Sequence, residues 1–272
     1  MLRNEGTLKK SWDSGFWHER FVQQAGWTKE LRQYLYRRAG MEKARRILEV
    51  GCGTGAILQE LEAGGLVCGL DRFRPHLTQA ARHSPSARLA EGDAHHLPYP
   101  GGAFDLSLCH FLLLWVDDAA RVIREMARVT RRGGAVLALA EPDYGGRIDY
   151  PEELAVIGKW QMEALRRQGA DPLIGRKLND IFHQAGLQAI ETGLLGGQWS
   201  GAPARTEWEM EWQVIAADLT PDPGKAETID LLKQLDHSAW ERGARVLFTP
   251  VFYAWGIVSD ERPGSREGTR FK

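Results

Sequence analysis

The stretch Ile47-Leu48-Glu49-Val50-Gly51-Cys52-Gly53-Thr54-Gly55 decides the fold. Its apolar first half has the composition of a buried strand, and three glycines at alternate positions follow directly. Ile57, Leu58 and Leu61 then share one face of a helix-period segment. The pattern predicts a strand, a tight turn and a helix. Glycine lets the backbone of the turn approach a ligand without a Cβ in the way, and the helix N-terminus adds free N–H groups.

A second apolar run, Leu66–Leu70, ends at Asp71. An acid at this place accepts hydrogen bonds from a ribose diol in nucleotide-binding βαβ units, so the sequence predicts a nucleoside site. The turn differs from the dinucleotide fingerprint G-x-G-x-x-G, because its spacing is G-x-G-x-G and Glu49 precedes it. The Glu49 carboxylate would repel a pyrophosphate and would suit a cationic ligand end.

Further short motifs follow in a fixed order, and with them the sequence resembles the class I S-adenosylmethionine (SAM)-dependent methyltransferases. The matching segments, spread over about residues 45–145, are Glu49–Gly55, Asp71, Glu91-Gly92-Asp93-Ala94, Phe104-Asp105 and Arg132-Gly133-Gly134. The resemblance implies an α/β fold of three layers, the Rossmann-like methyltransferase fold. Its seven-stranded sheet would be mostly parallel with an antiparallel last strand, and helical cap elements would be added.

The resemblance also implies SAM as cofactor, S-adenosylhomocysteine as product and a set of binding residues. That set is Glu49, Gly51, Cys52, Gly53, Thr54, Gly55, Asp71, Arg72, Asp93, Ala94 and His110. The turn would surround the methionine part, with Glu49 near the amino end, and Asp71 would hold both ribose hydroxyls. Arg72 and Phe73 would pack near the adenine. Asp93 would accept from the adenine amino group, with the Ala94 N–H facing a ring nitrogen.

His110 follows the fourth predicted strand, and the resemblance places it near the sulfonium and the substrate entrance. It is the candidate catalytic residue, because an unperturbed imidazole titrates near neutral pH. The alternative is that His110 stacks or hydrogen-bonds beside SAM. Glu141, Asp143 and Tyr144 follow the fifth strand and are further base candidates, or simply end the strand.

Composition excludes several classes. The net charge of −1 over 272 residues, with no basic arm, argues against nucleic acid as a partner. No apolar run approaches the ~20 residues that span a bilayer, and Met1-Leu2-Arg3-Asn4-Glu5 lacks an apolar signal core. The odd number of cysteines, three, favours a reduced cytoplasmic protein without disulfides. His95 and His96 are adjacent and lack further ligands at suitable spacing, so we expect loop residues and no metal site.

Strands are predicted at 46–50, 66–70, 87–91, 104–110, 135–141, 187–195 and 248–257. A helix capped by Asp117 or Asp118 is predicted at 118–130. Residues 1–40 form a predicted lid segment with one helix at about 19–39, before a methyltransferase domain at 41–272. Helical cap insertions are predicted at about 145–172 and 200–245, with helices near 204–219 and 225–242. We expect two helices within 145–185 and a frayed end after Ser259.

Of the 10 tryptophans, only Trp115 falls within residues 40–150. Segments on both sides of the core could therefore fold over the carboxyl ends of the strands as an aromatic cap. We expect at least two tryptophans to line a pocket there, while others only pack the cap. The leading hypothesis is a SAM-dependent methyltransferase that acts on a small aromatic or hydrophobic metabolite. The alternatives are a non-catalytic SAM-binding regulatory or partner protein, an enzyme with a protein acceptor, and a nicotinamide-dependent oxidoreductase. The acceptor atom and the oligomeric state are left open.

Overall fold

The computed structural model describes residues 14–61, 65–194, 196, 201–219 and 226–259. One sheet of seven strands has the order β3-β2-β1-β4-β5-β9-β7. Its strands are β1 (Arg46–Val50), β2 (Leu66–Asp71), β3 (Arg88–Glu91), β4 (Phe104–Cys109), β5 (Thr130–Pro142), β7 (Gln188–Leu194) and β9 (Val251–Ile257). Strands β1 to β5 pair in parallel, whereas β9 runs antiparallel to both β5 and β7. The predicted sheet with an antiparallel last strand is confirmed.

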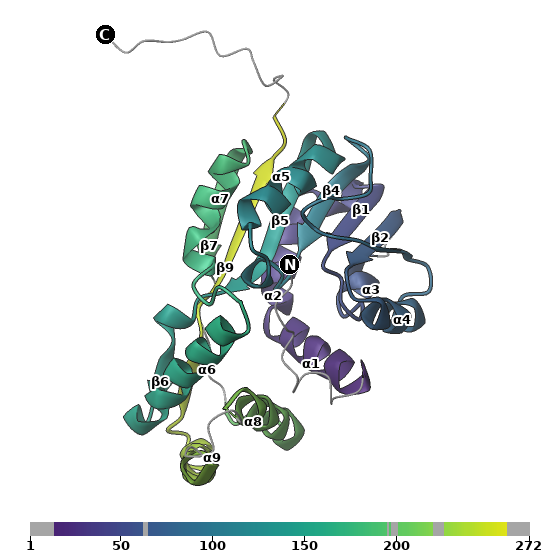
Figure 1. Cartoon of the computed structure of the whole chain (residues 1–272). Helices are drawn as coiled ribbons and strands as arrows, with labels where there is room; N and C mark the ends of the chain where they lie inside the picture. The colour runs from purple at the N-terminus through teal and green to yellow at the C-terminus, as the bar shows by residue number, and fades with distance from the viewer. Residues whose placement is uncertain (1–13, 62–64, 195, 197–200, 220–225, 260–272) are drawn as a thin grey trace, which may run out of the picture.

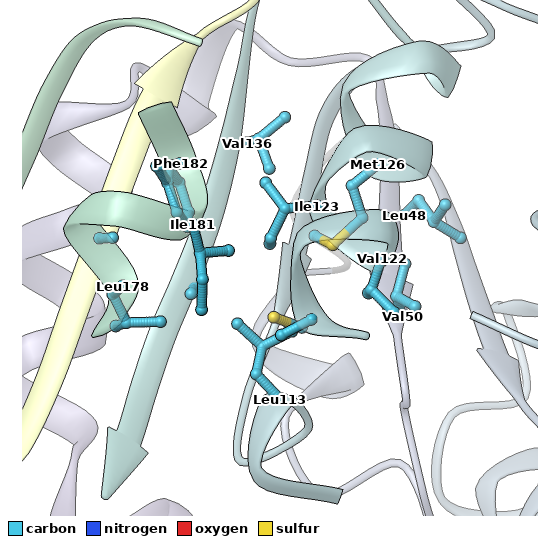
Figure 2. Packing of buried hydrophobic residues seen from close by; sticks show 14 of the residues in the cluster. Leu48, Val50, Leu113, Val122, Ile123, Met126, Val136, Leu178, Ile181 and Phe182 are labelled. Atoms are coloured by element: carbon cyan, nitrogen blue, oxygen red, sulfur yellow. The ribbon is translucent and has the colours of Figure 1, made fainter. Parts of the chain in front are cut away.

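Helices cover both faces of this sheet, and the side-chain period of two decides which strand residues face which layer. Leu48 and Val50 pack with α5 (Ala119–Val129) and α7 (Leu178–Gln184) in one core, which Figure 2 shows around Ile123 and Phe182. Ile47 packs on the opposite face, with α3 (Leu58–Leu61) and α4 (Arg74–His83). The Asp118 side chain caps α5 by accepting from Arg121 N at 2.8 Å, as predicted.

The N-terminal segment contains two helices, α1 (Ser14–Trp27) and α2 (Lys29–Arg38), where one helix was predicted. The break is at Thr28, which has φ −114° and ψ 10°. Gly26 lies just before it, and glycine weakens a helix interior. The Thr28 side chain instead reaches a residue at the end of β4, which local sequence cannot reveal. The prediction of one continuous helix was therefore wrong.

A group of helices lies beyond the carboxyl ends of the parallel strands, on the same side of the sheet as α1 (Figure 1). It consists of α6 (Ala155–Arg167), α8 (Arg205–Leu219) and α9 (Ala226–Glu241), together with the antiparallel pair β6 (Ile148–Tyr150) and β8 (Val246–Phe248). We call these elements the cap. Leu154, Ile157, Trp212, Ile215 and Leu232 form a separate small core inside it. The helices predicted near 204–219 and 225–242 are present, although residues 220–225 lie outside the described part.

The strand predicted at 248–257 is two strands. β8 ends at Phe248 and β9 begins at Val251, because Pro250 has no N–H to offer a ladder. The remaining short elements are 3-10 turns at Met41–Lys43, Leu113–Trp115, Tyr144–Gly146, Glu152–Leu154 and Gly175–Lys177. The prediction of a frayed end after Ser259 falls outside the described residues. The boundary at residue 40 stays a prediction.

Within the described residues, no helix combines the length and apolar character that crossing a bilayer requires. Cys52, Cys68 and Cys109 are all buried with free thiols. No group of three or more potential metal ligands occurs among the described residues.

Candidate active site

A cavity of about 1490 Å³ lies at the carboxyl ends of the strands, between the glycine turn, α1 and the cap. Seven of the predicted site residues line it: Glu49, Gly51, Asp71, Arg72, Asp93, Ala94 and His110. These residues follow β1, β2, β3 and β4 or end those strands, so the parallel sheet brings them to one edge.

The other four predicted residues shape the turn behind this wall. Cys52 and Thr54 are buried, and burial raises the pKa of the Cys52 thiol well above its usual value. Gly53 donates its N–H to Asp71 Oδ2 at 2.9 Å. Gly55 has φ +82° and lies so close to Ala80 that a Cβ would meet the Cα of that residue at 3.2 Å. Direct contact of these four residues with a cofactor stays a prediction.

Gly51 is the glycine at which the turn touches the cavity. Its φ of +74° favours glycine, and a Cβ there would lie 2.7 Å from Leu112 Cδ1. Its N–H and that of Cys52 both donate to the carbonyl of Leu70, at 2.7 and 3.0 Å. The backbone of the turn is thereby tied to β2, whose last residue is Asp71.

Asp71 carries a carboxylate that is fixed from two sides. Oδ2 accepts from Gly53 N at 2.9 Å, and Oδ1 accepts from Phe73 N at 2.8 Å. Each carboxylate oxygen has a further lone pair that these backbone bonds leave unused. Asp71 is therefore a rigid double acceptor at the cavity wall, which suits a vicinal diol.

Glu49 presents a buried carboxyl to the same cavity. The residue is only 3% exposed, and Oε2 has no hydrogen-bond partner among the described residues. Burial raises the pKa of Glu49 well above its usual value, and the nearby charge of Asp71 adds to this effect. A buried, unpartnered carboxyl costs free energy that a cationic ligand would recover.

Binding of SAM should therefore expel a proton from Glu49. The raised pKa means that the free protein holds this proton above the 4.5 of an ordinary glutamate, whereas an ammonium group favours the ionised form. Affinity should rise as the pH increases through the raised pKa of Glu49 and should then level off. Calorimetry in two buffers of different ionisation enthalpy measures the proton release, and Glu49→Gln should show neither the release nor the pH dependence. The same pH profile in both proteins would contradict the assignment.

Asp93 and its neighbours line the same cavity as Glu49 and Asp71. Asp93 Oδ1 accepts from the His95 backbone at 2.9 Å and lies 2.8 Å from His95 Nδ1. Partial burial opposes ionisation of Asp93, but these hydrogen bonds outweigh it and lower its pKa. Ala94, Arg72 and the half-exposed Phe73 complete this side of the cavity. His95 is thus a loop residue held by an acid, as predicted.

His110 is joined to the N-terminal helices by a chain of hydrogen bonds. Its Nε2 lies 2.8 Å from Thr28 Oγ1, which in turn accepts from Arg32 Nη1 at 2.7 Å. The Thr28 hydroxyl also lies 3.5 Å from the carbonyl oxygen of Ala25, to which it can donate, so the donor between Thr28 and His110 depends on the histidine tautomer. Burial, followed by the charge of Arg32, lowers the pKa of His110 to about 3. The imidazole is neutral and its Nε2 is engaged with Thr28, so this geometry supports a positioning role over proton abstraction.

The depressed pKa of His110 predicts an acid-dependent loss of stability. Below about pH 6.5 the unfolded chain binds a proton at this histidine that the native protein does not, down to the native pKa of about 3. As the pH is lowered from about 6.5 to about 3, the free energy of unfolding of the wild type should fall by about 1.4 kcal/mol per pH unit relative to that of His110→Asn. Urea unfolding at several pH values tests this, with the exposed His237→Asn as control. Parallel curves for wild type and His110→Asn would refute it.

The three candidate bases after β5 have separate roles. Glu141 is fully buried and accepts from the backbone N–H groups of Leu112, Leu113 and Leu114 at 2.9, 2.9 and 3.3 Å. Burial raises its pKa to about 8, although these hydrogen bonds oppose the shift. Asp143 pairs with Arg176 at 2.5 Å, and its Oδ1 accepts from Gly145 N at 2.9 Å. Both acids therefore support the backbone.

Tyr144 is the one residue of the three that lines the cavity. Burial, followed by the charge of Glu211, raises its pKa to about 12 against the opposing effect of Arg147 and Arg20. Its hydroxyl has no hydrogen-bond partner among the described residues, so it is a neutral group able to bind a polar atom of an acceptor.

The contacts made by the N-terminal helices were missed by sequence reasoning. Arg32 is 1% exposed and its Nε donates to Glu60 at 2.9 Å. His18 Nδ1 lies 3.0 Å from Thr54 Oγ1, and a Cβ on Gly53 would lie 3.3 Å from the ring of Phe21. Arg20 of α1 pairs with Glu211 of α8 at 2.6 Å. The helices thus hold the glycine turn on one side and the cap on the other.

Tryptophan side chains are frequent in the lining of the cavity. The cavity lining includes Trp17, Trp27, Trp115, Trp208, Trp212 and Trp240. The prediction that at least two tryptophans line the pocket is confirmed. Trp212 also belongs to the small core of the cap, so the packing role applies as well. Trp12 and Trp199 lie outside the described residues.

Comparison with known proteins agrees with this geometry. A family model described as a methyltransferase domain matches residues 48–138, which include the glycine turn, Asp71, Asp93 and His110. Over these residues the chain is similar to the class I SAM-dependent methyltransferases. Among curated methyltransferases, it is 34% identical over 118 residues to demethylmenaquinone methyltransferase of Geobacillus kaustophilus (strain HTA426), covering 40% of this chain and 50% of that protein. It is 32% identical over 118 residues to malonyl-[acyl-carrier protein] O-methyltransferase of Erwinia pyrifoliae (strain DSM 12163 / CIP 106111 / Ep16/96), covering 43% and 45%.

The fold agrees over a longer stretch than the sequence. A putative methyltransferase from an antibiotic biosynthesis pathway of Anabaena variabilis ATCC 29413 superposes with a TM-score of 0.61 at 18% identity, covering 83% of this chain and 95% of that one. Phosphoethanolamine N-methyltransferase 2 of Haemonchus contortus, in complex with S-adenosylhomocysteine, gives a TM-score of 0.56 at 16% identity, with 85% and 53% covered. The chain spans about half the length of the curated methyltransferases that it matches first.

SAM is the cofactor of the methyltransferase family, and the residues on the cofactor side of the cavity fit it. The unpartnered Oε2 of Glu49 suits the ammonium group, and the two fixed oxygens of Asp71 suit the ribose hydroxyls. Asp93 retains acceptor capacity beyond its bonds to His95, as an adenine amino group requires.

Proposed function

We propose that this chain transfers the methyl group of SAM to a small aromatic or apolar metabolite. One observation carries the proposal: a single cavity extends from Glu49 and Asp71 to the tryptophans of the cap. Its 1490 Å³ exceeds the about 300–1,000 Å³ of a pocket for one drug-sized ligand. The cavity therefore has space for an acceptor next to the residues that we propose bind the cofactor. We call the part of the cavity that the tryptophans line the chamber. Its open space favours an enzyme over a SAM-binding protein without activity.

When bound, SAM supplies an activated methyl group and its own leaving group. The chain then has to hold the acceptor in line and exclude water. In our proposal, Glu49, Asp71 and Asp93 bind the cofactor, and His110 positions it from the end of β4. The N-terminal helices close the cavity through Phe21 and the Arg20–Glu211 pair, and Tyr144 binds a polar atom of the acceptor.

The names of the curated relatives include demethylmenaquinone, malonyl-[acyl-carrier protein] and phosphatidylethanolamine. Because these names differ in substrate, they do not indicate the acceptor of this chain. We infer the acceptor class from the tryptophans that line the cavity, which favour a flat apolar molecule. We further propose a small-molecule acceptor rather than nucleic acid, because the net charge is −1. Three buried free thiols support a reducing, cytoplasmic location.

The test is methyl transfer from labelled SAM to 2-naphthol, 2-naphthylamine and 2-naphthalenethiol, which offer oxygen, nitrogen and sulfur on one flat ring. We expect label in at least one methylated product, with S-adenosylhomocysteine formed in equal amount. The Asp71→Ala variant is the control and should lose most of this activity at a SAM concentration near the wild-type KM. Wild-type protein that binds SAM without labelling any of the three acceptors would favour the non-catalytic alternative.

A further inference from the structure

Two tryptophans of the chamber wall donate to the same oxygen of one aspartate. Trp208 and Trp212 lie one turn apart on α8, and their Nε1–H groups donate to Asp236 Oδ2 of α9 at 2.6 and 3.0 Å. Both indoles line the cavity, and their ring centroids are 6.3 Å apart with a tilt of 58°. Asp236 itself is 4% exposed. The polar edges of both rings are thus turned to one buried carboxylate.

The other oxygen of Asp236 belongs to a buried ionic network. Oδ1 accepts from Arg245 Nε at 2.5 Å, Arg245 Nη2 donates to Asp149 at 2.7 Å, and Arg147 Nε donates to Asp149 at 2.6 Å. Two arginines and two aspartates are therefore paired in sequence. Their side chains are at most 7% exposed, so each charge is compensated within the network. A charged ligand would find its counter-charge already engaged there.

We infer that Asp236 is a positioning residue for the methyl acceptor, and that the chamber it organises selects a neutral aromatic acceptor over an anionic one. The inference rests on the proposed function. An indole N–H is a donor only and needs an acceptor when buried. By binding both N–H groups away from the ligand, Asp236 leaves the ring carbons of Trp208 and Trp212 as wall. A carboxylate placed against this wall would lose hydration without gaining a partner, because Arg147 and Arg245 are already paired.

Asp149 provides a matched control, because it belongs to the same network and pairs with Arg245, whereas both indole N–H groups donate to Asp236 and not to Asp149. Asp236→Asn and Asp149→Asn both remove one buried negative charge. The asparagine at 236 has to point its amide NH2 group either at the indole N–H groups or at Arg245, so it cannot replace both sets of bonds. A general loss of the ionic network would affect both variants equally, whereas a positioning role affects only the first.

The experiment is calorimetric titration of the full chain with 2-naphthol and naphthalene-2-carboxylate, each with and without S-adenosylhomocysteine. We expect the wild type to bind 2-naphthol at least about tenfold more tightly than the carboxylate. Asp236→Asn should weaken 2-naphthol about tenfold or more, whereas Asp149→Asn should change it by less than about threefold. Equal weakening in both variants, or tighter binding of the carboxylate by the wild type, would overturn the inference.

Two further measurements keep the inference separate from folding and from the proposed function. If Asp236→Asn does not fold, the double variant Trp208→Phe, Trp212→Phe keeps aromatic faces but has no N–H for Asp236, and it should lose 2-naphthol affinity. Unchanged affinity in the double variant would also overturn the inference. SAM affinity should be the same in wild type and Asp236→Asn. Failure of the wild type to bind SAM would defeat the proposed function, while the binding preference between the two naphthalene probes would still be measurable.

Discussion

Replacing Asp71 with alanine should weaken SAM binding by at least about 100-fold. Hydrogen bonds to a charged group contribute about 1.5–3 kcal/mol, and each 1.4 kcal/mol is a factor of ten in affinity. The ribose diol loses two such bonds, and Gly53 and Phe73 lose the acceptor that orders the turn. Calorimetric titration with SAM measures the effect directly. An affinity that is unchanged in Asp71→Ala would refute the ribose role.

The control for this variant is Asp105→Ala. Asp105 also accepts two backbone N–H groups, those of Arg45 and Arg46, both at 2.9 Å. It lies near the start of β4, at the opposite end of the sheet from the cavity, and does not contribute to the cavity lining. We expect Asp105→Ala to lose some stability and to keep its SAM affinity. Equal loss of affinity in both variants would mean that a general loss of stability, and not ribose binding, explains the Asp71 result.

Replacing Glu141 with alanine should lower the free energy of unfolding by at least about 3 kcal/mol, because each of three backbone donors left without a partner costs about 1–3 kcal/mol. Glu141 is the shared acceptor of three consecutive backbone N–H groups between β4 and α5. Alanine removes all of these bonds and leaves a void in a fully buried place. Urea unfolding followed by circular dichroism measures the loss.

Glu125→Ala is the matched control, because Glu125 Oε2 also accepts a backbone N–H, that of Leu97 at 2.9 Å. Its side chain is about one-fifth exposed, so water can replace the lost acceptor. We expect a loss of less than about 1 kcal/mol there. A Glu141→Ala variant as stable as Glu125→Ala would show that the buried amides find other partners, and that Glu141 is free for a role with substrate.

Local sequence was sufficient to predict the parallel core and the cofactor side of the cavity. Buried parallel strands are short apolar runs, such as Ile47–Val50, and turn glycines with positive φ have few substitutes. Because parallel strands end at one edge of a sheet, the positions of Glu49, Asp71 and His110 after their strands predict that they lie together. The capping role of Asp118 followed from its place before an amphipathic run.

The features that could not be predicted depend on partners distant in the chain. Thr28, at the helix break, hydrogen-bonds to His110. The charge of buried Arg32 is neutralised by Glu60, 28 residues away. Asp236 left one local signal, an acid between Leu232, Leu235 and Ala239 on the apolar face of a predicted helix. This pattern predicts a buried acid but does not predict its partners. The indoles and Arg245 that bind Asp236 come from other segments of the chain.

The most direct test of the account is calorimetric titration of the whole chain with SAM, S-adenosylhomocysteine and NADH. Oε2 of the buried Glu49 has no hydrogen-bond partner among the described residues, and the glycine turn that follows Glu49 lacks the dinucleotide spacing. We therefore predict that SAM and S-adenosylhomocysteine bind and that NADH does not. Binding of NADH alone, or of none of the three, would contradict the assignment of this cavity to SAM.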